Sequence, residues 1–148
     1  MRRNPKLIAL ALVLAAAGCG RDAGQLTAPT EPRLTTFSRT YGVSAVTLTG
    51  SPPTQAGFSG GHVDAVLVAD ADGSFTFLGT VESNDGPDAF FKPANQALRL
   101  TAVPVGTGCV FDQWVLSTPT NVSITVAGNP INVDDYRPYS YARAEFVC

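Results

Sequence analysis

The sequence predicts an all-β fold, a small β-sheet module that is either grasp-like or a two-layer sandwich. Charged residues make up only 15% of the 148 residues, whereas 14 glycines and 11 prolines supply many turns. From about residue 41 onward, apolar and polar residues alternate with a period of two, and β-branched side chains are frequent. No stretch has a convincing helical period. We therefore expect one β-rich domain over residues 37–148, behind a signal peptide and a flexible tether.

Residues 1–18 have the composition of an export signal. Arg2, Arg3 and Lys6 precede an unbroken apolar run over residues 7–17. This run is too short to span a bilayer as a helix but suits the core of a signal peptide. We therefore expect an exported protein.

The end of this signal reads Ala16-Ala17-Gly18-Cys19 and resembles the lipobox of bacterial lipoproteins, although Ala16 stands where that family usually has leucine. The resemblance implies cleavage before Cys19 and a lipid on its thiol. Gly20, rather than aspartate, follows the cysteine, which by the sorting rules of Gram-negative lipoproteins implies the outer membrane. The alternative is an ordinary secretory leader cut after Ala17.

Residues 19–36 are small, polar and proline-containing, and we expect them to form a flexible tether. Once residues 1–18 are removed, seven basic residues face twelve acidic ones, so the side-chain charge falls from −2 to −5. No basic stripe remains, which argues against nucleic acid as a partner. Membrane attachment would therefore come from the lipid.

The two-residue period predicts seven strands in the domain. They cover residues 43–49, 62–69, 74–81, 97–103, 109–115, 122–126 and 139–148. Residues 50–61 are expected to be a loop rich in Gly, Pro and Ser, and residues 82–96 to be irregular.

A hairpin joins the second and third of these strands, because Asp72-Gly73 between two strand patterns is a strong turn signal. Phe75, Phe77 and Val81 are expected to share one face of the third strand. In the fourth strand, Leu98, Leu100 and Ala102 share one face in the same way, and Pro104 ends it.

The cysteines predict one disulfide. If Cys19 carries lipid, Cys109 and Cys148 are left, and an exported domain favours a bridge between them. Cys109 shares a face with Phe111 and Cys148 shares one with Phe146, so both should point towards the same core. Closing a loop of about 40 residues contributes roughly 4 kcal/mol in the chain-entropy model.

Several pieces of the C-terminal half occur in a family's order. They are GTV at 79–81, FKPANQALRLTAVP at 91–104, GCVFDQW at 108–114, NVSITV at 121–126 and ARAEF at 142–146. This order resembles the divergent internalin-B-type B-repeat, the bacterial repeat of cell-surface proteins, over residues 79–147. The resemblance implies a small β-rich, grasp-like module that acts as a spacer or interaction unit rather than an enzyme. Residues 128–138 would be an insertion, and a single tethered copy makes a spacer less natural.

Catalysis and metal binding find little support. His62 is the only histidine and lies at a strand start without a partner motif, so we interpret it as a polar strand-end residue. Asp70, Asp72 and Ser74 resemble the first half of a calcium loop, but Val81 stands where the twelfth-position glutamate would be, which favours a simple turn. We expect no metal, no cofactor and no enzyme activity.

Two further groups of residues bear on ligand binding and catalysis. Phe111 and Trp114 could form a ligand platform, but packing in the core is the expected use. An enzyme would need a cleft with perturbed acids, for instance Asp112 near Asp64, and their spacing does not demand one.

An interaction surface is expected at Tyr136, Arg137, Tyr139 and Tyr141. Tyr139 and Tyr141 should share the face opposite Phe146, and exposed tyrosines beside an arginine suit protein or glycan contact. The alternative is a strand covered by the N-terminal half. We expect a lipid-anchored envelope protein that serves as an interaction or structural module. The alternatives are a carbohydrate-binding module and a subunit of an envelope assembly.

Overall fold

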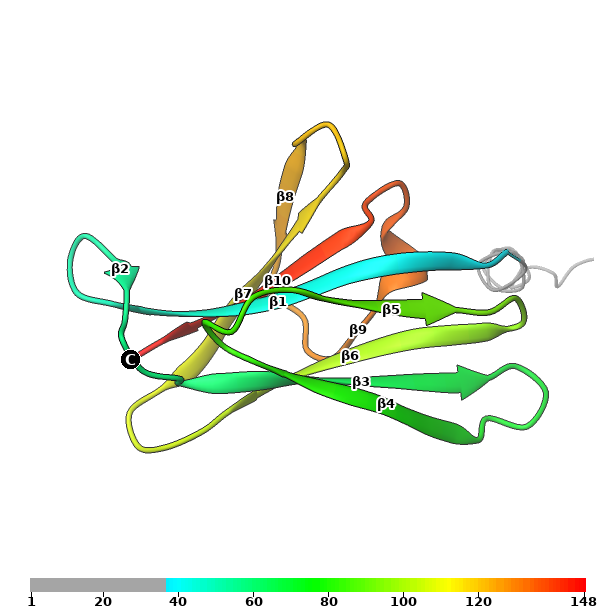
Figure 1. The fold of residues 1–148 in the computed structure, drawn as a ribbon, viewed down its shortest axis with the longest axis horizontal. Coiled ribbons are helices and arrows are strands. Elements are labelled where there is room, and N and C mark those ends of the chain that lie inside the picture. Colours follow the sequence, from blue (N-terminus) through cyan, green and yellow to red (C-terminus); the bar gives the residue numbers. More distant parts are fainter. Residues whose placement is uncertain (1–36) are drawn as a thin grey trace, which may run out of the picture. The chain divides into compact units, whose positions relative to one another are not determined.

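The prediction of an all-β fold is confirmed. The computed structural model describes residues 37–148, which lie in one compact unit, Leu34–Cys148. Two sheets pack face to face as a sandwich, and no α-helix occurs in the described part (Figure 1). The expected signal peptide, Cys19 and tether lie outside the described residues. Within residues 37–148, no helix has the length and apolar character needed to cross a membrane.

The elements follow one another as short strands with one turn of 3-10 helix. They are β1 (Arg39–Thr49), β2 (Thr54–Gln55), β3 (Gly61–Ala69), β4 (Phe75–Glu82), β5 (Asp88–Lys92), β6 (Gln96–Pro104), β7 (Val110–Ser117), β8 (Ser123–Val126), β9 (Ile131–Asn132), the 3-10 helix η1 (Val133–Tyr136) and β10 (Tyr141–Val147). All seven expected strands are present with shifted ends. The sequence reasoning missed β2, β5, β9 and η1.

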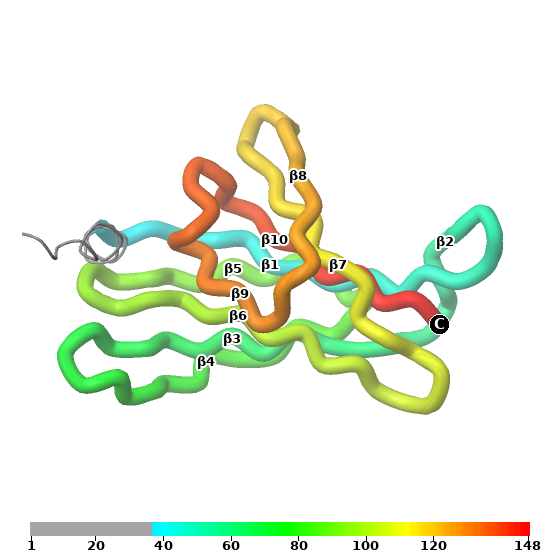
Figure 2. The backbone as a smooth tube through the Cα atoms, turned by 180° about the vertical axis from the view of Figure 1, so that it is seen from behind, coloured from blue at the N-terminus to red at the C-terminus, as the bar shows by residue number. Residues whose placement is uncertain are grey.

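The first sheet has the order β2-β1-β10-β7-β8, and β5 pairs with β1. The first and last long strands of the domain, β1 and β10, lie side by side in parallel, with Gly42 opposite Tyr141 and Leu48 opposite Val147 (Figures 1 and 2). The other pairs of this sheet are antiparallel. The hairpin that joins β7 and β8 projects away from the sandwich in both views.

The second sheet has the order β4-β3-β6-β9 and is antiparallel throughout. The hairpin predicted from Asp72-Gly73 joins β3 and β4, with Gly73 at φ +72° and its N–H donating to the carbonyl of Ala69. A positive φ is costly for residues with a Cβ, so glycine suits this turn.

A bulge in β4 overturns one expectation. The register passes from Ala65 opposite Gly79 to Val66 opposite Phe77, so Leu78 is an extra residue. An extra residue reverses which side chains face the core. Val81 is therefore buried at 2% exposure, whereas Phe75 and Phe77 are 62% exposed on the outer side of the second sheet, where the sequence had placed all three together.

One hydrophobic core lies between the sheets. Trp114 and Phe146 of the first sheet, and Leu98 and Leu100 of the second, have no exposed surface. Burying side chains of this size stabilises a fold by about 1.5–3 kcal/mol each. Phe111 packs against Trp114, with ring centroids 5.5 Å apart, so the core role expected for this pair is confirmed.

The N-terminal strands complete both sheets. β1 supplies the parallel partner of β10, and β3 supplies the central partner of both β4 and β6. Residues 79–147 therefore contribute strands to both layers, and these strands are hydrogen-bonded to strands within residues 39–69.

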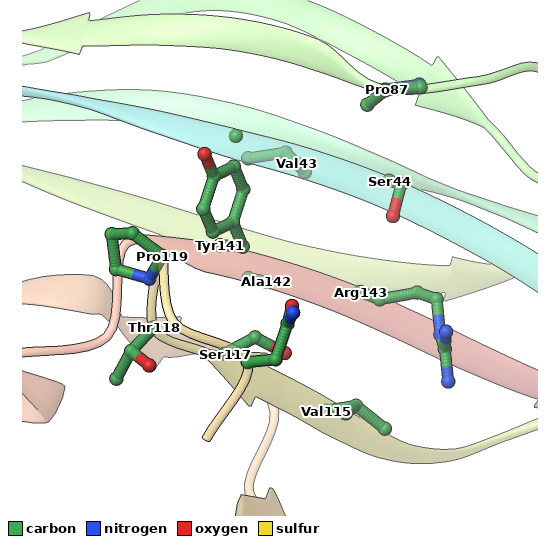
Figure 3. Close-up of a pocket in the computed structure, with 12 residues that line it drawn as sticks. Val43, Ser44, Pro87, Val115, Ser117, Thr118, Pro119, Tyr141, Ala142 and Arg143 are labelled. Atoms are coloured by element: carbon green, nitrogen blue, oxygen red, sulfur yellow. The ribbon is translucent and has the colours of Figure 1, made fainter. Parts of the chain in front are cut away.

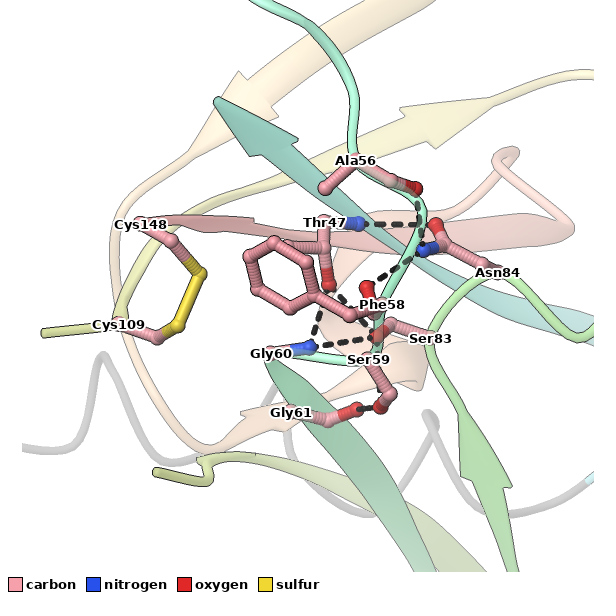
Figure 4. The surroundings of a disulfide bond; sticks show 10 residues. All are labelled: Thr47, Ala56, Phe58, Ser59, Gly60, Gly61, Ser83, Asn84, Cys109 and Cys148. Carbon is pink, nitrogen blue, oxygen red and sulfur yellow. Dashed lines mark hydrogen bonds between the residues drawn. A yellow bond between two sulfur atoms is a disulfide. The ribbon is translucent and has the colours of Figure 1, made fainter. Parts of the chain in front are cut away.

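The expected disulfide between Cys109 and Cys148 is confirmed. It lies close to Gly60, the residue before β3 (Figure 4). A buried network adjoins it: the hydroxyl of Thr47 lies 2.7 Å from that of Ser83 and accepts from the Gly60 N–H at 2.7 Å. The bridge links the beginning of β7 to the end of β10 within the first sheet. The network joins β1 of the first sheet to the residues that precede β3 and follow β4 in the second.

Candidate functional site

The side of the first sheet that points away from the core is hollowed and carries an exposed aromatic ring, that of Tyr141. We call it the outer face, and define it by the outward side chains of three adjacent strands. They are Gly42, Ser44 and Val46 of β1, Tyr141, Arg143 and Glu145 of β10, and Gln113, Val115 and Ser117 of β7. These positions face solvent because the alternate residues of each strand point into the core.

Two open hollows lie on this face and share Ser44 and Arg143 in their linings. Figure 3 shows the residues that line the first. The first, of about 340 Å³, is bounded by Thr118 and Pro119 of the β7–β8 turn and by Pro87. The second, of about 500 Å³, extends towards Asn84 and Glu145. Arg143 thus occupies the middle of one elongated depression.

The ring of Tyr141 can lie close to β1 because its neighbour in that strand, Gly42, has no side chain. A Cβ added to Gly42 would lie 2.6 Å from ring carbon Cδ1 of Tyr141, which no side chain allows. The ring therefore lies against the β1 backbone while 51% of the residue stays exposed (Figure 3). An aromatic side chain held in this way presents its surface with little conformational freedom left to lose on binding.

The charges of this face are arranged around Glu145. Arg143 Nη2 donates to Glu145 Oε1 at 2.7 Å, and Gln113 Nε2 donates to Glu145 Oε2 at 2.8 Å. Both carboxylate oxygens are thus occupied, and Glu145 is 8% exposed. The Arg143 side chain keeps 49% of its surface in solvent, and its fork has further N–H donors.

The expected interaction cluster is divided by the fold. Tyr141 lies on the outer face, but Tyr136 and Tyr139 are half-buried and pack against the core. Tyr139 precedes β10 in a turn, where its N–H donates to the carbonyl of Tyr136, so the shared exposed face expected for Tyr139 and Tyr141 is wrong. Arg137 is exposed, with its guanidinium 4.6 Å from the ring of Phe37.

The sequence alone did not predict that Gly42, Ser44 and Ser117 belong to this site. It did place Arg143 and Glu145 on one face of the last strand, opposite the alanines. What it lacked was the parallel pairing of β1 with β10, because no local pattern specifies which distant strands become neighbours.

His62 and the acids near it lie on the other sheet. His62 Nε2 is 3.5 Å from Asp64 Oδ1, and Asp64 Oδ1 accepts from the hydroxyl of Thr80 at 2.8 Å. Nucleophilic catalysis needs the hydroxyl on the imidazole, with the carboxylate behind it. Here the hydroxyl donates to the carboxylate. Asp112 lies on β7 in the first sheet, so it does not share a sheet with Asp64.

Asp72 stabilises the β3–β4 turn in which it lies. Asp72 Oδ1 accepts the backbone N–H of Ser74 at 3.0 Å, and this hydrogen bond lowers the pKa of the Asp72 carboxyl. Among residues 37–148, no three His, Cys, Asp or Glu side chains are grouped so as to hold a metal ion.

Comparison with protein-family models, with curated proteins and with solved structures finds no match to this chain.

Proposed function

We propose that this chain is an exported, lipid-anchored envelope protein whose β-sandwich binds a partner protein through the outer face, without catalysis. The observation that carries this proposal is Tyr141, held flat against Gly42 beside the half-exposed Arg143. Tyrosine and arginine are among the side chains that most often dominate binding at protein interfaces.

The open shape of the outer face also favours a binding surface over an enzyme active site. Both hollows are open to solvent, whereas enzymes surround their reacting atoms and exclude water. The buried carboxylate of this face, Glu145, already accepts two hydrogen bonds from Arg143 and Gln113. This leaves it poorly placed to act as an acid or base.

The proposal of a lipid anchor rests on Cys19 and the small residues before it. Metabolic labelling with a palmitate analogue should mark the protein, and Cys19→Ser should release a soluble form. Equal membrane retention of the Cys19→Ser protein would contradict the anchor but leave the contact surface open to its own test.

Site-specific photo-crosslinking in intact envelopes tests the contact surface. A photoreactive residue at Ser44, on the outer face, should give a discrete protein adduct that Tyr141→Ala and Arg143→Ala each reduce. The matched control places the same residue at Phe77, which is exposed on the opposite sheet. Similar adducts from Ser44 and Phe77, or adducts that survive both alanine variants, contradict the proposal. A stoichiometric adduct would support the further proposal that the chain is a subunit of an envelope assembly.

A glycan is the second candidate ligand, because Tyr141 lines the first hollow together with the polar residues Ser117 and Thr118. Sugars bind by stacking on an aromatic ring while nearby polar groups take their hydroxyls. Tyrosine fluorescence should then change on addition of envelope polysaccharide and stop changing in Tyr141→Ala. An unchanged wild-type signal removes this candidate. The resemblance of residues 79–147 to a bacterial repeat is consistent with both partners.

A further inference from the structure

Three polar side chains from separate elements meet inside the core at the end of the sandwich away from the disulfide. Lys92 is the last residue of β5, Asp134 lies in η1, and Tyr41 lies in β1. Lys92 and Asp134 have no exposed surface, and Tyr41 is 2% exposed. Lysine and aspartate are among the residues least often buried completely, so their complete burial here calls for a specific arrangement.

The amine and the carboxyl face each other. Lys92 Nζ lies 3.4 Å from Asp134 Oδ2, and Oδ2 accepts no hydrogen bond within the described part of the chain. The Tyr41 hydroxyl donates to the other oxygen, Asp134 Oδ1, at 3.2 Å. Nζ also donates to the carbonyl of Gln96 at 3.0 Å, which fixes the end of the lysine chain.

This site is a costly place for two full charges. Removing an ammonium and a carboxylate from water costs several kcal/mol per ion, and attraction between them offsets that cost only with good hydrogen bonding. Burial raises the pKa of Asp134, and the nearby Lys92 and Tyr41 offset this effect only in part. Transfer of a proton from Lys92 to Asp134 therefore relieves the burial of both charges and leaves an amine beside a carboxylic acid.

We propose that Lys92 and Asp134 condense to form an internal amide crosslink. The lone pair of Nζ attacks Cγ of the protonated Asp134 carboxyl, and a C–N bond forms. The Cγ–Oδ2 bond breaks, and Oδ2 leaves as water with one proton from the carboxyl and one from the amine. The ion pair contains every atom of the amide and of the water, so no oxidant, reductant or co-reactant is needed.

Tyr41 favours this step through its hydrogen bond to Oδ1, the carboxyl oxygen that remains in the amide. Its hydroxyl donates to Oδ1, which carries the developing negative charge in the tetrahedral intermediate and becomes the amide oxygen. A preorganised donor in a site without water stabilises such charge strongly. The leaving oxygen, Oδ2, is the one that accepts no hydrogen bond from residues 37–148.

The crosslink would complement the disulfide. Lys92 lies opposite Arg39 at the beginning of β1, whereas Cys148 donates its N–H to Leu48 near the end of that strand. Asp134 follows β9 of the second sheet, so the new amide would join the two sheets. The domain would then carry one covalent bond beside each end of β1.

Peptide mapping by mass spectrometry tests the proposal on the full chain as it is isolated. Trypsin cleaves after Lys and Arg but not before Pro, so residue 92, followed by Pro93, and residue 137, followed by Pro138, are left uncut. Digestion of the denatured and reduced protein therefore yields fragments 40–99 and 100–143. We expect these two as a single species whose mass is their sum less one water. Two separate fragments at their full masses overturn the proposal.

Variants assign the bond to its two side chains. Lys92→Met and Asp134→Ala should each give two separate fragments, whereas the neighbouring Asp135→Ala should remain linked. Tyr41→Phe keeps the ring but lacks the donor, and freshly synthesised protein should contain a larger unlinked fraction that declines with time. Linkage in Asp134→Ala would overturn the assignment to this residue, and wild-type rates in Tyr41→Phe would overturn the role of the hydroxyl.

Discussion

Gly61 and Phe146 are in direct contact across the sandwich. Gly61 begins β3 in the second sheet, and the ring of Phe146, from β10 in the first sheet, occupies the position that a Cβ on Gly61 would take. Phe146 has no exposed surface, so its ring cannot move aside into solvent. The two sheets approach this closely only because residue 61 has no side chain.

Gly61→Ala should therefore destabilise the domain. Overpacking a filled core costs about 1–3 kcal/mol. Urea unfolding should show a lower midpoint for this variant, while Gly57→Ala and Gly128→Ala, where nothing lies within 4 Å of an added Cβ, serve as matched controls. Equal midpoints for all three variants would show that the core accommodates the methyl group.

Removal of the disulfide should weaken the fold by roughly 3–4 kcal/mol, because Cys109 and Cys148 close a loop with a sequence separation of 39. The double variant Cys109→Ser/Cys148→Ser and the reduced wild-type protein should unfold at similar, lowered urea concentrations. Reductant should leave the double variant unchanged. A wild-type midpoint that does not respond to reductant would contradict this prediction.

The sequence could predict what depends on neighbours along the chain. The alternation in β10 placed Ala144 and Phe146 inside, and the parity of the cysteines predicted their bridge. The Asp72-Gly73 pair predicted the β3–β4 hairpin. In each case the signal is a backbone preference or a two-residue period, which local residues determine.

The rest depends on contacts between distant segments. β5 was missed because Asp88–Lys92 is short and lies between turn residues, and its strand conformation comes from pairing with β1. Lys92 was not expected in the core, since its burial depends on Asp134, far along the chain. The outer face likewise needed the parallel pairing of the first and last long strands.

Asn84 should contribute more to the stability of the domain than a turn residue usually does. Its amide nitrogen donates to the carbonyls of Ala56 and Phe58, at 3.0 and 2.8 Å, and its Oδ1 accepts the N–H of the buried Thr47 at 3.1 Å (Figure 4). Asn84→Gly should cost about 1–3 kcal/mol, because partners left unsatisfied in the interior lose their hydrogen bonds.

Asn84→Ala should cost about 1–2 kcal/mol more than Asn84→Gly, because φ at this position is 67° and a Cβ disfavours it. Asn121→Gly is the control, since Asn121 has the same φ but an exposed side chain. Chemical denaturation of the four proteins separates the two contributions. A loss in Asn121→Gly as large as in Asn84→Gly would argue against the hydrogen bonds.

Alkaline pH should destabilise the domain through Tyr41. Burial, with the nearby Asp134, raises the pKa of Tyr41 from 10.0 to about 12. The folded state therefore holds this proton more tightly than the unfolded chain. The resulting stability is complete below pH 10 and is lost as the pH rises to about 12, in all about 2–3 kcal/mol.

Unfolding free energies measured between pH 9 and 12 should fall less steeply for Tyr41→Phe than for the wild-type protein. Absorbance of the folded protein should also show a tyrosine with an apparent pKa near 12 that the variant lacks. Because desolvation is the largest cause of the raised pKa of Tyr41, the pKa should remain raised even when Asp134 is uncharged. Parallel pH profiles for both proteins would exclude Tyr41 as the source.

The bulge at Leu78 predicts that two apolar residues of β4 differ sharply in their importance. Val81→Ser removes a side chain that is 2% exposed and should cost about 2–4 kcal/mol. Phe77→Ser changes a residue that is 62% exposed and should alter stability by no more than about 0.5 kcal/mol. Without the bulge, the regular alternation would bury both residues, and the larger phenylalanine would be the costlier loss. Thermal unfolding of the two variants distinguishes these cases, and a larger loss in Phe77→Ser would show that β4 has no bulge.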